Sequence, residues 1–171
     1  MKKNLKPTIY VKDIYSINYD KLKQDNIDTL LFDIDNTIAT TKEKVPNNKV
    51  KELIEKLKKQ DFKIFIISNA LKRRALRFGN SLNIKTYYFS AKPLKKQYLR
   101  IIKENNLKVK NIAAIGDQIY TDIKGANNIG IKSILVDPKS KKESIITKIN
   151  RLKENKLIKK SKLIEKGRYY E

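Results

Sequence analysis

Asp33 and Asp35 stand two positions apart, directly after an apolar run that contains Leu30, Leu31 and Phe32. Two carboxylates so close together can divide nucleophilic and acid–base work between them, or bind a cation. An apolar strand has no packing reason to end in two acids, because unpaired buried charge is costly. A solvated strand end would explain the pair without any chemistry, and we regard that as the weaker interpretation.

Polar residues suited to phosphate chemistry follow three further apolar runs. Ser68 and Asn69 come after the second run, although alone they could be an ordinary helix cap. Lys92 follows the third run, and one Lys in so basic a chain proves nothing by itself. Asp117 follows the fourth run and Asp122 comes five residues later. Two acids at a junction between a loop and a helix suit a hard cation.

The segments between these motifs alternate between strand-like and helix-like patterns. Strands are expected over 28–34, 62–67, 86–89, 111–115 and 133–136. Helices are expected after a cap at Asn47 or Asn48, from Leu71 to Leu82, from Leu94 to Ile102, and over 119–127. The alternation predicts an α/β fold: a Rossmann-like parallel sheet of about five strands, flanked by helices. Ligands bind beyond the carboxyl ends of such strands, so the polar motifs should lie together there.

The composition limits the chemistry and the domain count. The chain has 171 residues and contains neither His nor Cys. A Ser-His-Asp triad, a Cys nucleophile and a His/Cys zinc site are therefore excluded, and any metal must be bound by oxygen. The length suits one domain over 1–171. We expect an N-terminal extension over 1–27, with a short helix near Tyr19–Gln24, and a basic helical tail over 139–171.

The net charge of +22 has two explanations. A positive field of this size attracts polyanions or an anionic membrane surface. A chain rich in Lys, Ile and Asn is also what an AT-rich coding sequence produces, and only six of the 40 basic residues are Arg. In the tail, Ile145, Ile149 and Leu152 keep helical spacing, so this segment could pack on the sheet or lie on anionic lipid.

Membrane insertion and secretion are both disfavoured by the sequence. The longest aliphatic–aromatic run covers only 64–67, far below the length of a membrane span. The N-terminus lacks the apolar stretch of a secretory signal. We therefore expect a cytoplasmic protein, with peripheral contact at the inner face of the membrane as a further expectation.

The four motifs, taken in order, resemble those of the haloacid dehalogenase superfamily of phosphohydrolases. Within it, the chain is similar to the IIIA-type YqeG-like phosphatases, which include phosphatidylglycerophosphate phosphatases. The shared features span nearly the whole chain: Pro7, the stretch at 15–17, DIDNT at 33–37, SNA at 68–70, AKP at 91–93, GDQ at 116–118, Asp122, and the basic stretch at 147–151.

The resemblance implies a role for each motif residue. Asp33 would be the nucleophile that forms an aspartyl-phosphate, and Asp35 the general acid and base. Mg²⁺ would lie among Asp33, the Asp35 backbone carbonyl and Asp117. The remaining roles implied are phosphate binding by Ser68 and the Asn69 backbone, charge neutralisation by Lys92, support of the nucleophile loop by Thr37, and orientation of the metal shell or of Lys92 by Asp122.

The substrate is the feature that the sequence determines least. Too few residues separate the motifs to hold a cap domain, so we expect an open site that suits a phosphate displayed on a large body. Phosphatidylglycerophosphate, dephosphorylated to phosphatidylglycerol, is what the subfamily resemblance implies. The alternatives are a nucleic-acid, nucleotide or protein phosphatase and a non-catalytic basic interaction module. A partner subunit could also form a lid, and the sequence leaves the oligomeric state open.

Overall fold

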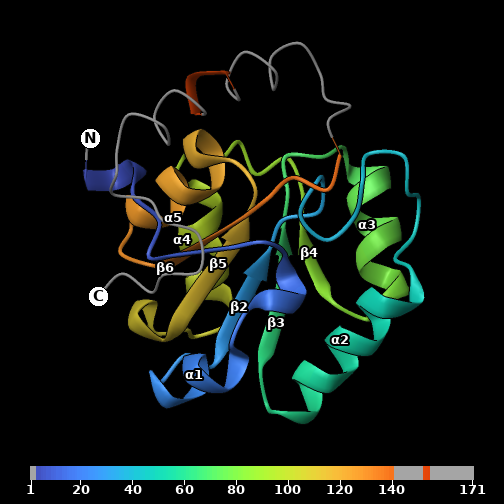
Figure 1. Ribbon diagram of the computed structural model, residues 1–171, viewed down its shortest axis with the longest axis horizontal. Coiled ribbons are helices and arrows are strands. Elements are labelled where there is room, and N and C mark those ends of the chain that lie inside the picture. Colours follow the sequence, from blue (N-terminus) through green and yellow to red (C-terminus); the bar gives the residue numbers. More distant parts are fainter. Residues whose placement is uncertain (1–2, 141–151, 155–171) are drawn as a thin grey trace.

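A computed structural model describes residues 3–140 and 152–154 of the chain. Six strands form one sheet in the order β1-β6-β5-β2-β3-β4, and every neighbouring pair is parallel (Figure 1). The strands are β1 (Ile9–Val11), β2 (Thr29–Phe32), β3 (Lys63–Ile67), β4 (Lys85–Tyr87), β5 (Ile112–Gly116) and β6 (Lys132–Val136). The predicted α/β fold is confirmed.

A helical segment follows each of the strands from β1 to β5. The α-helices are α1 (Tyr19–Gln24), α2 (Asn48–Lys59), α3 (Lys72–Ser81), α4 (Lys96–Glu104) and α5 (Lys124–Asn127). Short 3-10 turns form η1 (Lys3–Leu5), η2 (Ile14–Ser16) and η3 (Val109–Asn111), and η4 (Ile119–Ile123) is a π-helical turn. The expected cap is present, because the Asn47 side chain accepts a hydrogen bond from the Val50 amide at 3.0 Å.

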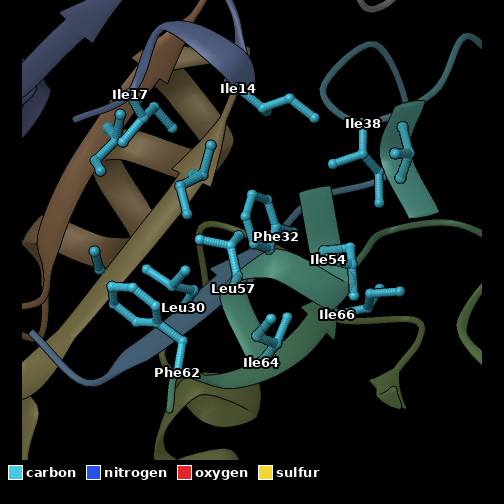
Figure 2. Close-up of a cluster of buried hydrophobic side chains, with 14 of the residues drawn as sticks. Ile14, Ile17, Leu30, Phe32, Ile38, Ile54, Leu57, Phe62, Ile64 and Ile66 are labelled. Atoms are coloured by element: carbon cyan, nitrogen blue, oxygen red, sulfur yellow. The ribbon is translucent and has the colours of Figure 1, made fainter. Parts of the chain in front are cut away.

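Two apolar layers sandwich the sheet, as the period-two alternation of its strands requires. Leu30 and Phe32 of β2 point to the layer that contains α1, α2 and α3, whereas Leu31 points to the layer that contains α4 and α5. Figure 2 shows the first layer, in which Ile54 and Leu57 of α2 lie over the β2 and β3 side chains. Burial on both faces explains why the central strands are continuously apolar.

The N-terminal segment supplies one strand more than expected. Ile9, Tyr10 and Val11 pair in parallel with Ile134, Leu135 and Val136 of β6, so β1 forms one edge of the sheet. Only three residues long, β1 carries too weak an alternation to be recognised alone. The short helix expected near Tyr19–Gln24 is confirmed as α1.

Several expected element boundaries differ from the observed ones by one or two residues, and the helix expected over 119–127 is a π-helical turn, η4, followed by α5. Strand β4 ends at Tyr87 and α4 begins at Lys96, so Phe89 and Leu94 lie in the loop between them, and both side chains are exposed. The described chain has no inserted domain: only turns separate β2 from α2, and α3 alone separates β3 from β4. The predicted absence of a cap domain is thus confirmed. Most of the expected tail helix lies outside the described residues.

Candidate active site

The predicted site residues converge at one edge of the sheet, formed by the loops after the carboxyl ends of the strands; we call this the carboxyl edge. Six of the eight predicted residues are almost fully buried there: Asp33, Thr37, Ser68, Lys92, Asp117 and Asp122. Asn69 is exposed and Asp35 is partly exposed. All eight predicted residues therefore lie where the strand-end argument placed them.

A tight turn after β2 sends the two aspartates in different directions. The Asp33 amide bonds to the Ile115 carbonyl at 3.0 Å, which prolongs the pairing of β2 with β5 by one residue. The Ile34 carbonyl then accepts the amides of Thr37, Ile38 and Ala39. Asn36 reaches a φ of 62°, which Asn tolerates better than most residues. The DIDNT stretch thus folds around one carbonyl oxygen.

Lys92 connects the buried groups at the base of the site, which we call the floor. Its Nζ donates to Asp33 Oδ1 at 2.7 Å, to Asp122 Oδ1 and to the Ile67 carbonyl at 3.0 Å. The three protons of the ammonium thus have three acceptors. Burial by itself lowers the pKa of Lys92, but the Asp122 and Asp33 carboxylates together raise it above its ordinary value. Lys92 is therefore a fixed positive charge.

Asp122 is held on both of its carboxylate oxygens. Oδ1 accepts from Lys92, while Oδ2 accepts the Gln118 amide at 3.1 Å and the Thr121 hydroxyl at 3.2 Å. The close approach of Asp122 also explains Gly116, because a Cβ there would lie 2.3 Å from the Asp122 Cγ. The π-helical turn η4 and this glycine together aim Asp122 at Lys92.

Three buried carboxylates form a donor set that fits a hard cation. Single oxygens of Asp33, Asp117 and Asp122 all lie within 4.8 Å of one another. Burial raises the pKa of Asp33 to about 7; Lys92 opposes that increase, and the Asp122 charge adds to it. Asp117 also accepts from the Thr37 hydroxyl at 3.2 Å. Lys92 is one positive charge beside three carboxylates, and a divalent cation would offset the negative charge that remains.

Asp35 lies at the solvent-exposed entrance of the site. Its carboxylate is paired with an arginine that the sequence patterns did not reveal. Arg74 of α3 donates Nε and Nη2 to Asp35 Oδ1, at 2.9 and 2.5 Å. The same guanidinium donates to the Thr40 and Glu43 carbonyls at 3.0 and 2.8 Å. Both side chains are about one-quarter exposed, at 23% and 30%. One available signal was an Arg in the first turn after Ser68-Asn69, in a chain with few Arg.

The Ser68-Asn69 motif and the Lys92 loop are joined by the side chain of Asn69. The Asn69 Oδ1 accepts the Lys92 amide at 2.8 Å, which fixes the start of the Lys92 loop against the end of β3. Ser68 is buried, and its hydroxyl accepts the Ala70 amide at 3.1 Å. The main chain thus turns at Ser68 just before α3 begins at Lys72. The two motifs form one connected wall of the site.

Comparison with known proteins agrees with this geometry. Residues 38–130 match the family model of haloacid dehalogenase-like hydrolases. The probable phosphatase YqeG of Bacillus subtilis (strain 168) is 34% identical over 167 residues, which cover 98% of this chain and 96% of that protein. The chain belongs to the haloacid dehalogenase-like hydrolase family. These two matches support a phosphatase, as the sequence predicted.

Solved structures share the fold at low sequence identity. The cobalt-bound form of the deoxy-D-mannose-octulosonate 8-phosphate phosphatase of Haemophilus influenzae superposes with a TM-score of 0.55 at 16% identity, over 75% of this chain and 77% of that one. An uncharacterized protein from Listeria monocytogenes serotype 4b gives a TM-score of 0.55 at 18% identity, over 79% and 100% of the two chains. For both proteins, the similarity to this chain concerns the fold alone.

Proposed function

We propose that this protein is a magnesium-dependent phosphomonoesterase that works through an aspartyl-phosphate on Asp33 and converts phosphatidylglycerophosphate to phosphatidylglycerol. The observation that carries the proposed chemistry is the buried Lys92 ammonium, bonded to Asp33 and Asp122 beside the Asp117 carboxylate. A site meant only to bind a cation would gain nothing from a lysine at its centre. A site that must hold a phosphate next to carboxylates needs that charge.

Asp33, Asp117 and the backbone carbonyl of Asp35 are the groups that we assign to the metal. We assign Asp122 to positioning Lys92, because both of its oxygens already accept hydrogen bonds. When bound, Mg²⁺ would supply the positive charge that lets an anionic carboxylate approach an anionic phosphate. The cobalt in the Haemophilus influenzae phosphatase supports a divalent metal on this fold.

The protein groups divide the two chemical steps between them. An Asp33 oxygen bonds to phosphorus as the bond from phosphorus to the ester oxygen breaks, and Asp35 gives its proton to the leaving alkoxide. Asp35 then takes a proton from a water whose oxygen bonds to phosphorus, which releases inorganic phosphate and restores the Asp33 carboxylate. Ser68 and the backbone amide of Asn69 hold phosphate oxygens, and Lys92 offsets the negative charge of these oxygens. Thr37 holds Asp117 in position.

The lipid substrate is supported by three features. The chain resembles YqeG-like phosphatases, its site has no cap, and its surface is strongly basic. Enzymes for small metabolites gain from closing the site against water, whereas a headgroup held at a membrane must be reached from outside. None of the helices among the described residues is long and apolar enough to cross a bilayer. The substrate would then be reached from the membrane surface.

The test is phosphate release with Mg²⁺ and with EDTA. Phosphatidylglycerophosphate in vesicles is compared with sugar phosphates, nucleotides, phosphopeptides and 3′-phosphorylated oligonucleotides. We expect kcat/KM for the lipid to exceed the others by at least about tenfold, a difference of about 1.4 kcal/mol in transition-state binding, and EDTA to abolish it. No release from any substrate would overturn the phosphatase, and a preferred water-soluble substrate would overturn only the lipid assignment.

A further inference from the structure

Exposed apolar side chains gather at the carboxyl edge of the sheet. Seven large apolar residues among those described are exposed: Tyr15, Val45, Leu71, Phe89, Leu94, Leu99 and Leu152. The first five lie in segments that follow the carboxyl ends of β1, β2, β3 and β4. Leu99 lies in α4, and the described loops at the opposite edge of the sheet contain none of the seven. Apolar exposure therefore concentrates around the site.

Four of these residues lie on loops that are bonded to one another, and we call Val45, Leu71, Phe89 and Leu94 the apolar rim. The Phe89 amide donates to the Ala70 carbonyl, beside Leu71, at 3.4 Å. Arg74 connects the loop of Val45 to the first turn of α3 through the Thr40 and Glu43 carbonyls. The loops that carry the rim are thus joined to one another and border the candidate active site.

Phe89 is held in an unfavourable state in two respects. Its φ is 47°, in the left-handed region where a bulky residue is a rare outlier. The residue is also 57% exposed, although Phe is a large apolar side chain that usually lies in the core. Such outliers cluster at functional positions. An aromatic side chain presented to solvent by a strained backbone points to a partner that covers it.

The charges of the rim loops select that partner. Exposed cations stand in the same loops and at the helix starts beside them, among them Lys42, Lys44, Lys72, Arg73, Lys95 and Lys96. Glu43 is the only acid in 40–47, 69–73 and 88–96, and its carboxylate is occupied by the Thr40 amide and the Asn47 side chain. Apolar tips surrounded by lysines are typical of surfaces that bind anionic lipid, whereas nucleic acid is read mainly by arginine and stacked aromatics.

We propose that the apolar rim is the surface by which this protein docks on an anionic phospholipid membrane, with the candidate active site facing the headgroups. The docking surface deepens the proposed lipid-phosphatase function and rests on it. It also moves the main contact away from the tail beginning at Lys139, where the sequence had suggested it. A rim contact brings the phosphate to Asp33 and Lys92 without the lipid leaving the bilayer.

A single tryptophan tests the contact directly, because the chain contains no Trp. Phe89→Trp should show a blue shift of its emission on addition of vesicles containing phosphatidylglycerol, and none with phosphatidylcholine alone. Leu99→Trp is the matched control, since Leu99 is similarly exposed but lies outside the rim. A shift of both, or of neither, on anionic vesicles would overturn the proposed docking surface.

Substitutions in the rim provide the second test. The triple variant Leu71→Ser, Phe89→Asn and Leu94→Ser should weaken binding to anionic vesicles by at least about tenfold, while p-nitrophenyl phosphate turnover stays within about twofold. Asn is chosen at position 89 because it tolerates positive φ. Lys72→Glu with Lys95→Glu should weaken binding similarly, whereas Lys108→Glu with Lys110→Glu, at the opposite edge of the sheet, should do so much less.

The outcomes separate the docking surface from the proposed substrate. If the rim variants lose vesicle binding but the wild type hydrolyses no lipid phosphate, docking stands and the substrate assignment fails. If the rim variants hydrolyse vesicle-borne phosphatidylglycerophosphate as fast as wild type, the substrate stands and the rim docking is wrong. Rim-dependent binding to a 3′-phosphorylated oligonucleotide, with none to vesicles, would replace the membrane by nucleic acid.

Discussion

The floor and the solvent-exposed entrance of the candidate site each hold one of two aspartates. The two residues are two positions apart in sequence, yet their surroundings differ. Asp33 is 6% exposed and bonds to the buried Lys92. The Asp35 side chain is 30% exposed and bonds to Arg74, whose guanidinium also holds the 40–43 turn. The floor is buried, whereas the entrance borders solvent. The turn around the Ile34 carbonyl thus produces two chemically distinct carboxylates from one short motif.

This contrast matches what the two proposed steps need. A nucleophile must be fixed in place, and Lys92 does that for Asp33. An acid–base group must exchange protons with a leaving group and with water, which requires access from solvent. A substitution in one region should therefore leave the other intact.

The largest effect is expected from Asp33→Asn at the floor. We expect phosphate release to fall by at least about three orders of magnitude, because the amide cannot form the aspartyl-phosphate. The fold should persist, since the substitution removes one of several clustered negative charges. Steady-state release with Mg²⁺ and circular dichroism check both points.

Asp61→Asn is the matched control, because Asp61 is exposed at the opposite edge of the sheet. It should leave turnover within about twofold, as surface substitutions usually do. Substantial turnover by Asp33→Asn, with Asp61→Asn unchanged, would remove Asp33 as the nucleophile.

Asp35→Asn, at the entrance of the site, should have the next largest effect on turnover. The size of this effect should depend on the leaving group. Alkyl phosphate esters should lose about 10²- to 10³-fold in kcat, because their alkoxide needs a proton. With p-nitrophenyl phosphate the first step needs little acid, so we expect a burst of p-nitrophenol followed by slow turnover. Rapid-mixing absorbance measures the burst, and a first step slowed equally for both kinds of ester, with no burst, would contradict the acid role.

Arg74→Met should have a smaller effect that acts through Asp35. We expect kcat for alkyl esters to fall about tenfold with KM nearly unchanged, and the loss to be much smaller in the Asp35→Asn background. Such coupling would identify Arg74 as a positioning residue. Arg74→Lys should recover only part of kcat, because an ammonium cannot reproduce the forked contacts. Independent, additive losses would instead assign Arg74 to loop stability alone.

The smallest effect concerns stability against pH in metal-free protein. Burial raises the pKa of Asp33 to about 7, above the ordinary value of 3.8. A group whose folded pKa is raised stabilises the fold at low pH, and this contribution is lost as pH rises through the folded pKa. Between about pH 4 and 7, the free energy of unfolding of wild type should therefore fall relative to that of Asp33→Asn.

Urea denaturation in EDTA at several pH values measures this difference. Saturating Mg²⁺ should reduce the decline, since a bound cation favours the ionised carboxylates. A pH-independent difference between the two proteins would show that Asp33 is ionised throughout, and that Lys92 alone balances its charge.

Local patterns in the sequence determined the strands, the helices and the edge where the site lies. Short apolar runs such as Leu30–Phe32 are typical of strands buried on both faces, and parallel strands place their following residues at one edge. Asp33, Ser68, Lys92 and Asp117 were located by this argument and by the resemblance of their motifs. The lack of His and Cys likewise limits the metal donors to oxygen, whatever fold the chain adopts.

Only the tertiary structure decided which of these side chains touch. Arg74 reaches Asp35 across 39 positions of sequence, and Lys92 reaches Asp33 across 59. Strand β1 exists because β6 offers it a free edge, and Phe89 and Leu94 are exposed because the chain turns between β4 and α4. Hydrophobic periodicity depends on neighbours along the chain, whereas ion pairs, sheet edges and loop exposure depend on residues far apart in sequence that the fold brings together.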